Sequence, residues 1–221
     1  GDLKLDATET GSALAEDLRR SLEGRVVFVA GSTHRGEETA ATTALEACEQ
    51  AGHAIVLVVA PRHLSRIDAV ERELVRAGRK VCRRSKLAGR VFEPGEVLLL
   101  DTVGELPGLY TRARAAFVGG TLAKIGGHNV LEPVQAGCPV VFGPSIDSIR
   151  RAVELVEASG SGTRVTDAEG LGRAVDRILR DPAGARSRIE EARRELQLHA
   201  GSVARTLALI RSVGPAIPRV G

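Results

Sequence analysis

The sequence predicts an α/β fold, a Rossmann-like parallel sheet with helices on both faces. Short apolar runs alternate with helix-compatible stretches along most of the chain, as in consecutive β-α-β units. The runs, such as residues 54–60 and, after Arg25, the rest of residues 25–30, are continuously apolar, which is typical of strands buried on both faces. Aromatic residues make up only 2% of the chain, so Ala, Val, Leu and Ile must build the core. The crossovers between strands should be right-handed.

Each expected strand is bounded by glycine, proline or polar residues that end the apolar run. The expected strands are residues 25–30, 54–60, 81–82, 97–100, 115–118 and 139–142. The helices expected between them are residues 36–50, 64–77, 106–112 and 131–136. The strand at 81–82 has the weakest pattern, because only two apolar residues support it.

The last third of the chain has a helical pattern. Thr166 and Glu169 have the spacing of a capping box, which predicts a helix that runs to about Arg180. Asp181-Pro182 should open another helix, and a separate last helix is expected after Gly201. We therefore expect an interdomain linker or helix remnant at 1–20, a nucleotide-sugar-binding domain at 21–214 and a flexible tail at 215–221.

The bulk composition is that of a soluble globular domain, with 43% hydrophobic residues, 27% charged residues and a net charge of +3. The scarcity of aromatic rings argues against nucleic acid as a partner, because base stacking requires them. Cys48 and Cys138 lie among apolar residues and are predicted to be buried thiols. With Cys82 they make an odd number without a C-x-x-C pair, which indicates a reducing compartment. No apolar run is long enough to span a bilayer.

Polar and glycine-rich segments follow four of the expected strands. Ligands of open parallel sheets bind at the carboxyl ends of the strands, where these segments should meet. The sequence therefore predicts one binding crevice at that edge. The four segments are residues 31–38, 61–63, 101–105 and 119–129.

The segment around Gly126 and Gly127 favours a phosphate ligand. Glycines let the backbone approach a ligand closely, and the helix expected from Leu131 would point free N–H groups at an anion. Glu132, in its first turn, could accept hydrogen bonds from ribose hydroxyls or simply complement the helix dipole. Arg62 could make a forked contact to phosphate or form an ordinary surface ion pair.

The loop after the first strand has two interpretations. Ser32 and Thr33 could cap the following helix, or their hydroxyls could contact a sugar or phosphate. His34 and Glu37 lie three residues apart and could form an acid/base pair, although their spacing favours a capping arrangement.

Several reaction classes are disfavoured by missing motifs. The chain lacks a P-loop, a strand-associated G-x-G-x-x-G and a G-x-S-x-G elbow, which argues against ATPases, dehydrogenases and esterases. Asp101 and Glu105 have no histidine partner nearby in sequence, so we expect no metal site.

Three segments together resemble one known family. They are Asp-Thr-Val-Gly-Glu-Leu at 101–106, Phe-Val-Gly-Gly-Thr-Leu at 117–122 and Gly-Gly-His-Asn-Val-Leu-Glu-Pro at 126–133. These segments are similar to the C-terminal half of the 3-deoxy-D-manno-octulosonic acid (Kdo) transferases. Residues 1–6, 30–38 and 61–63 resemble further segments of that family, and the likeness extends from Gly1 to about Pro144.

This sequence departs from the family pattern at five positions. The differences are Asp2 for Asn, Gly31 for Ala, Leu64 for Pro, Val103 for Met and Val130 for Pro. At Val103 and Val130 the backbone contacts of the family stay possible, so both positions are kept among the expected ligand contacts.

The resemblance implies the C-terminal domain of a GT-B glycosyltransferase, in which two Rossmann-like domains face a cleft and this one holds CMP-Kdo. By match to the family motifs, the CMP-Kdo contacts are expected at Pro61, Arg62, Val103, Gly104, Glu105, Asn129, Val130, Leu131 and Glu132. Further contacts are expected in the adjoining loops, at Ser32, Thr33, His34, Gly126, Gly127 and His128.

The resemblance also implies the role of the full enzyme. It transfers Kdo to lipid A precursor at the cytoplasmic face of the bacterial inner membrane, in lipopolysaccharide biosynthesis, without a metal or cofactor. The family's general base is a glutamate of the N-terminal domain. The expected partners are therefore CMP-Kdo, lipid A precursor, the N-terminal domain and the inner membrane surface. This chain alone is expected to be soluble and inactive, with no catalytic residue of its own.

Three alternatives stay open at this point. The chain could be the donor domain of another GT-B transferase that uses a UDP- or GDP-sugar, or a sugar-nucleotide epimerase of similar architecture. It could also be a non-catalytic nucleotide-binding domain.

Overall fold

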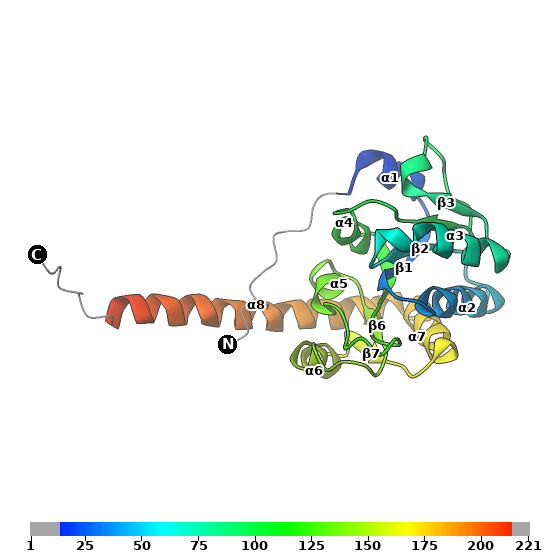
Figure 1. The fold of residues 1–221 in the computed structure, drawn as a ribbon. Helices are drawn as coiled ribbons and strands as arrows, with labels where there is room; N and C mark the ends of the chain where they lie inside the picture. The colour runs from blue at the N-terminus through cyan, green and yellow to red at the C-terminus, as the bar shows by residue number, and fades with distance from the viewer. Residues whose placement is uncertain (1–13, 214–221) are drawn as a thin grey trace, which may run out of the picture.

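The fold is a seven-stranded, wholly parallel sheet with the strand order β3-β4-β2-β1-β5-β6-β7 (Figure 1). The structure, a computed structural model, describes residues 14–213, with side chains to residue 197. The strands are β1 Val26–Thr33, β2 Ile55–Pro61, β3 Val81–Arg83, β4 Val97–Leu99, β5 Ala113–Val118, β6 Val140–Phe142 and β7 Gly162–Arg164. The predicted α/β fold with a parallel sheet is confirmed.

Strand β1 lies at the centre of the sheet because its residues are apolar on both faces. Phe28 and Ala30 pack into the core on one side, and Val27 and Val29 pack into the core on the other. The chain builds one half of the sheet from β1 through β4 and then returns to pair β5 with the free side of β1. The strand order reverses between β1 and β5, which makes the carboxyl ends of these two strands the expected place for a ligand.

Helices cover both faces of the sheet, as predicted (Figure 1). On one face, α2, α3 and α7 pack on β1 and β2, and on the other α1 and α4 do so. The helices are α1 Glu16–Ser21, α2 Glu37–Gln50, α3 Ile67–Arg76, α4 Leu106–Tyr110, α5 Leu131–Gln135, α6 Arg150–Ala158, α7 Ala168–Arg180 and α8 Pro182–Val213.

The C-terminal third differs from the prediction in three ways. Helix α6 and the edge strand β7 were not predicted. The N-cap of α7 is Asp167 rather than Thr166, and its carboxylate accepts a hydrogen bond from the Gly170 N–H at 2.6 Å. The two helices expected on either side of Gly201 are one helix, α8, which extends beyond the sheet (Figure 1). A single glycine costs a helix only about 1 kcal/mol, so it does not force a break.

Cys48 and Cys138 are buried thiols, as predicted, and burial raises the pKa of Cys48 to about 11. Of the segment expected to be a linker or helix remnant, residues 16–21 form α1, whose Leu18 is buried in the core. Residues 1–13 and the expected tail at 215–221 lie outside the described residues. Among the helices that the structure describes, none is long and apolar enough to cross a membrane.

Candidate functional site

The loops that follow β1, β2 and β5 meet at the carboxyl edge of the sheet. The Arg62 N–H donates to the Thr33 carbonyl at 2.9 Å, which ties the loop after β2 to the end of β1. The Gly119 N–H donates to the Gly31 carbonyl at 2.8 Å, which ties the loop after β5 to the same strand. These two contacts bring together residues that lie 29 and 88 positions apart in sequence. We call residues 31–36, 61–66, 101–105 and 119–132 the carboxyl-edge loops.

Glu37 organises the loop after β5 from a buried position at the start of α2. Its side chain is 1% exposed, and both carboxylate oxygens accept hydrogen bonds from backbone N–H groups. The donors are His34 (2.9 Å), Gly120 (2.8 Å), Thr121 (3.1 Å), Leu122 (2.9 Å) and Ala123 (2.9 Å). The N-cap residue of α2 is Gly36 and no side chain caps it, so the expected capping arrangement of His34 and Glu37 is wrong. Glu37 instead accepts from the His34 backbone N–H, and no hydrogen bond joins it to the His34 ring among the described side chains.

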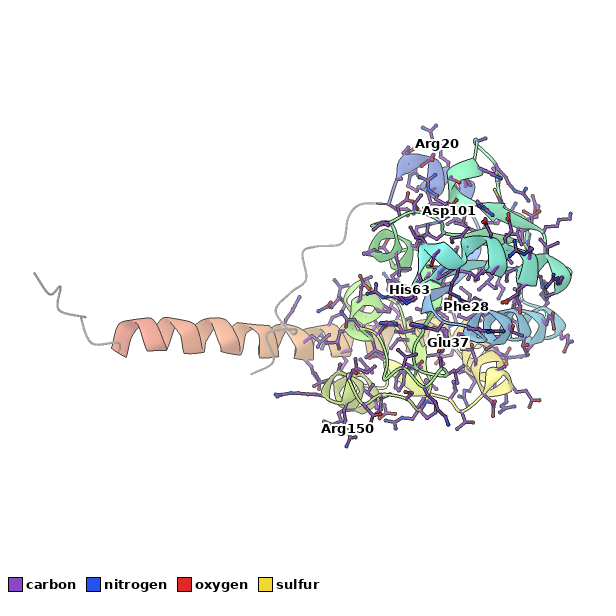
Figure 2. All side chains as sticks on the ribbon, in the orientation of Figure 1. Arg20, Phe28, Glu37, His63, Asp101 and Arg150 are labelled. Carbon is purple, nitrogen blue, oxygen red and sulfur yellow. The ribbon has the colours of Figure 1, made fainter. Side chains whose placement is uncertain are left out.

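We call the Glu37 carboxylate with its five N–H donors the clamp. Three histidines from three different loops lie together near it. The Nε2 atoms of His34 and His128 are 2.8 Å apart, and their rings stack with centroids 5.1 Å apart. The ring of His63, labelled in Figure 2, is edge-on to the ring of His34, and their centroids are 5.6 Å apart. One Nε2 must donate and the other must accept in the short contact, so it can form only while at least one ring is neutral. Burial, the largest cause, lowers the pKa of both His34 and His128.

Two arginines of the loop after β2 have opposite surroundings. Arg66 forms a double hydrogen bond with the buried carboxylate of Glu38, at 2.8 and 3.2 Å, and the Thr33 hydroxyl donates to the same carboxylate at 2.9 Å. Arg62 is exposed and has no carboxylate within 4 Å among the side chains that the structure describes. The surface ion pair considered for Arg62 is therefore absent from that part of the chain, and its guanidinium faces solvent.

The loop after β4 presents an exposed backbone and one fixed carboxylate. Val103 is 83% exposed and Gly104 has a φ of +88°, so the chain turns sharply here. Arg84 donates to Glu105 at 2.8 Å and to Asp17 at 2.8 Å, and Thr102 also donates to Glu105. Arg84 thus fixes the direction of the Glu105 carboxylate.

Gly126 and Gly127 adopt φ values of +96° and +89°, which favour glycine. A Cβ on Gly127 would lie only 2.6 Å from the Ile149 side chain. The Asn129 side chain accepts a hydrogen bond from the Leu131 N–H at 3.0 Å. The sequence predicted free N–H groups at the start of this helix, and the Leu131 N–H is not one of them because the Asn129 side-chain oxygen already accepts its hydrogen bond.

Glu132 lies half-buried in the first turn of α5, and burial raises the pKa of its carboxyl group. No hydrogen bond or ion pair to this carboxylate is present among the side chains from residue 14 to 197. Helix α5 packs against α4, which begins directly after Glu105. The two short helices that follow these carboxyl-edge loops are therefore neighbours.

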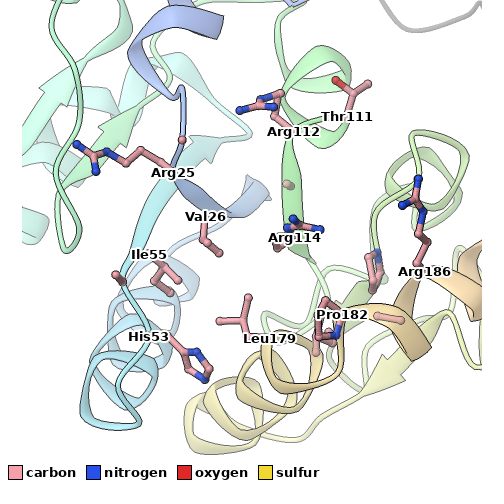
Figure 3. Close-up of a pocket in the computed structure, with 17 residues that line it drawn as sticks. Arg25, Val26, His53, Ile55, Thr111, Arg112, Arg114, Leu179, Pro182 and Arg186 are labelled. Atoms are coloured by element: carbon pink, nitrogen blue, oxygen red, sulfur yellow. The ribbon is translucent and has the colours of Figure 1, made fainter.

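A large cavity lined by described residues lies elsewhere. A hollow of about 780 Å³ opens at the amino ends of β1, β2 and β5, on the opposite edge of the sheet (Figure 3). We call it the amino-edge pocket. None of the carboxyl-edge loops lines it.

Comparison with known proteins identifies the family, although no protein-family model matches the chain. The crystal structure of the C-terminal CMP-Kdo binding domain of WaaA from Acinetobacter baumannii matches it with a TM-score of 0.72 and 30% identity. The match covers 80% of this chain and 91% of that domain. This chain belongs to the Kdo transferase family.

Curated Kdo transferases agree with this assignment. The enzyme of Bordetella pertussis is 37% identical over 190 residues, which are 83% of this chain and 44% of that protein. The enzyme of Aquifex aeolicus is 31% identical over 176 residues, which are 80% of this chain and 47% of that protein. The chain thus spans a little under half the length of these relatives. The calicheamicin glycosyltransferase CalG4, 16% identical with a TM-score of 0.52 over 46% of its chain, shares the GT-B donor-domain fold.

In this Kdo transferase domain, the residues expected from sequence, Gly126 and Gly127 apart, come from two sets of loops. Ser32, Thr33 and His34 meet Pro61, Arg62 and His128 around the β1–β5 junction. Val103, Gly104 and Glu105 lead into α4, and Asn129, Val130, Leu131 and Glu132 lead into or begin α5, the helix that packs against α4.

Sequence reasoning missed three interactions that shape the edge. The clamp made by Glu37, the Glu38–Arg66 pair and the contact of Arg84 with Glu105 all join segments that are distant in sequence. The sequence signal for the contacts of Glu37 and Glu38 was their position as an adjacent acidic pair shortly after a buried strand. A carboxylate at such a position is either exposed to solvent or hydrogen-bonded to other groups of the protein.

Proposed function

We propose that this chain is the donor-binding half of a glycosyltransferase that moves Kdo from CMP-Kdo to lipid A precursor. The observation that carries the proposal is the match to a CMP-Kdo binding domain over 91% of that domain. The proposed contacts are Pro61, Arg62, Val103, Gly104, Glu105, Asn129, Val130, Leu131 and Glu132. Ser32, Thr33, His34, Gly126, Gly127 and His128 would line the same site.

The proposed chemistry is a single displacement at the anomeric carbon of Kdo. The acceptor oxygen forms a bond to that carbon, the bond from the carbon to the phosphate oxygen breaks, and CMP leaves with the electron pair. Arg62 is suited to meet the charge that develops on the phosphate, because its guanidinium has no carboxylate partner among the described side chains. The acceptor's proton would pass to a base on another domain.

Glu105 and Glu132 would orient the nucleoside of the donor. Arg84 and Thr102 already hold Glu105 in place, so its remaining acceptor sites have a fixed direction. Glu132 has acceptor oxygens without described partners, half-buried beside α4. Carboxylates in such positions are suited to accept hydrogen bonds from ribose hydroxyls.

The domain arrangement belongs to the same proposal. We assign residues 21–214 to the donor domain and residues 1–20 to the connection with an N-terminal domain that supplies the base and the acceptor site. The full enzyme would work at the cytoplasmic face of the inner membrane, where lipid A precursor is available. The carboxyl-edge loops would then form one side of the interdomain cleft, and this chain alone would transfer no Kdo.

We expect this chain to bind CMP, and Arg62→Ala and Glu132→Ala each to weaken binding at least about tenfold, since each loses a charged hydrogen-bonding group. Isothermal titration calorimetry with CMP and, in parallel, UDP checks this and separates the cytidine donor from a uridine donor. Arg151→Ala, an exposed arginine of α6, is the matched control and should bind like the wild type. Equal binding by the wild type and Glu132→Ala, or a preference for UDP, would contradict the proposal.

The histidine pair predicts a pH dependence of CMP binding. In the free domain the pKa values of His34 and His128 are below the usual 6.5, so the pair is neutral at pH 7. The negative charge of a bound phosphate would raise both pKa values, whereas the charges of His63, Arg62 and Arg66 lower them. Binding would therefore take up a proton. Affinity should therefore rise as the pH falls from about 8 to about 6, by about three- to tenfold.

A double variant, His34→Gln with His128→Gln, isolates this effect. The phosphate of CMP itself titrates with a pKa of about 6, and this contribution is the same in both proteins. The difference between the two pH profiles therefore reports the histidines. Parallel profiles would show that the pair takes no proton on binding.

A further inference from the structure

The amino-edge pocket is a second candidate site, separate from the carboxyl-edge loops. Its floor is formed where the central strands begin, with Val26 at the start of β1 and Ile55 at the start of β2. Leu179 at the end of α7 and Pro182 at the start of α8 close one side (Figure 3). Its volume of about 780 Å³ is in the range of small-molecule sites.

The lining of the amino-edge pocket carries only basic charge. Four arginines and one histidine line it, and no aspartate or glutamate does. The basic residues are Arg25, His53, Arg112, Arg114 and Arg186 (Figure 3). A hollow bordered by one sign of charge concentrates ions of the opposite sign.

Three of these residues are already paired with acids outside the pocket. Arg25 donates to Glu93 at 3.0 Å, and His53 contacts Asp176 at 2.7 Å. Arg186 lies 3.5 Å from Glu190, with both side chains largely exposed. These three are not the main source of uncompensated charge.

Arg112 and Arg114 supply that charge. Neither has a carboxylate within 4 Å among the described side chains, and the contact found for Arg112 is a long one of 3.4 Å to the Leu22 carbonyl. They flank Ala113 at the start of β5, so two guanidinium groups lie at the mouth of the pocket. Two unpaired like charges repel each other, and a dianion between them removes that repulsion.

We propose that the amino-edge pocket binds the phosphate group of an organic phosphate, with Arg112 and Arg114 as the contact residues. Guanidinium forks match phosphate oxygens in pairs, which favours phosphate over smaller or singly charged anions. The floor of Val26, Ile55 and Leu179 accommodates the carbon skeleton that bears the phosphate. The ligand is either a soluble phosphomonoester or the headgroup of an anionic lipid. This proposal does not depend on the proposed function.

Calorimetry with inorganic phosphate and with glycerol 3-phosphate tests whether the ligand is a soluble phosphomonoester. Flotation with phosphatidylcholine vesicles, with and without phosphatidic acid, tests whether it is the headgroup of an anionic lipid. We expect glycerol 3-phosphate, phosphatidic acid vesicles or both to bind the wild type. Arg112→Gln with Arg114→Gln should weaken that binding at least about tenfold. Arg151→Gln with Arg194→Gln, which removes the same charge from exposed positions, should not.

The variant Arg62→Ala distinguishes phosphate binding at the amino-edge pocket from phosphate binding at the carboxyl-edge loops. Phosphate binding at the amino-edge pocket should survive this substitution, whatever it does to CMP binding. Loss of glycerol 3-phosphate binding in Arg62→Ala, no binding of any probe, or equal binding by both double variants would overturn the proposal. Arg112 and Arg114 are exposed, so the unfolding midpoint of their double glutamine variant should equal that of the wild type. A lysine pair at the same two positions should bind phosphate with intermediate affinity.

Discussion

Glu37→Ala is expected to destabilise the domain by about 3–5 kcal/mol, because it leaves five backbone N–H groups without their buried acceptor. The loss falls on the loop after β5, where Gly120 to Ala123 depend on one carboxylate. Guanidinium unfolding followed by circular dichroism measures the free energy of unfolding. CMP binding should fall as well, since His34 and His128 would lose their fixed spacing.

Two variants make the Glu37 result specific. Glu37→Gln keeps one carbonyl oxygen as an acceptor but turns an NH₂ group toward backbone donors, so it should lose an intermediate amount of stability. Glu46→Ala, on the same helix but 48% exposed, should cost less than about 1 kcal/mol. If Glu37→Ala and Glu46→Ala unfold at the same denaturant concentration, the clamp does not stabilise the fold.

Gly119→Ala is expected to destabilise the domain by about 3 kcal/mol, at the upper end for overpacking. A Cβ at this position would lie 2.3 Å from the Ser32 carbonyl oxygen and 2.7 Å from the Thr33 Cα. Both obstacles are backbone atoms of the central strand, so they cannot rotate away as a side chain could. Thermal and guanidinium unfolding measure the loss.

Gly170→Ala is the matched control for Gly119. Gly170 lies in helix α7, where its added Cβ meets only side-chain atoms, the closest being an Asp167 oxygen at 3.1 Å. Alanine is a better helix former than glycine, so this substitution should change stability by less than about 1 kcal/mol. Equal losses in the two variants would show that the approach of β5 to Ser32 is not a tight one.

The central strands could be predicted from sequence because both of their faces are buried. Every residue of β2 is buried, which produces the continuous apolar run that marked it. Strand β7 could not be predicted because it is a three-residue edge strand, Gly162–Arg164, without an apolar run and without a fully buried residue. Helix α6 offered only Val153 and Val156 as buried apolar positions, which is too short a repeat to recognise.

The position of the candidate site could also be predicted, because parallel topology places the loops after β1, β2 and β5 at one edge. The contacts within the site could not. Glu37 reaches backbone groups 83 to 86 residues later, and Arg84 reaches Glu105 from the segment after a different strand, β3. Such contacts depend on the final packing of the sheet, which no local pattern records. The hydrogen bond from the Leu131 N–H to the Asn129 side-chain oxygen was missed for another reason. An asparagine just before a helix can play several roles, and the sequence does not distinguish among them.

The carboxylate of Glu37 has a consequence for how the domain meets its ligand. The N–H groups of residues 120–123 converge on it as they would on a bound anion, so the protein carries its own anion there. The loop is consequently rigid before any ligand arrives, and association should involve little loss of backbone entropy at this segment. In the proposed CMP complex the phosphate would need donors other than the N–H groups of residues 120–123, because Glu37 already accepts their hydrogen bonds.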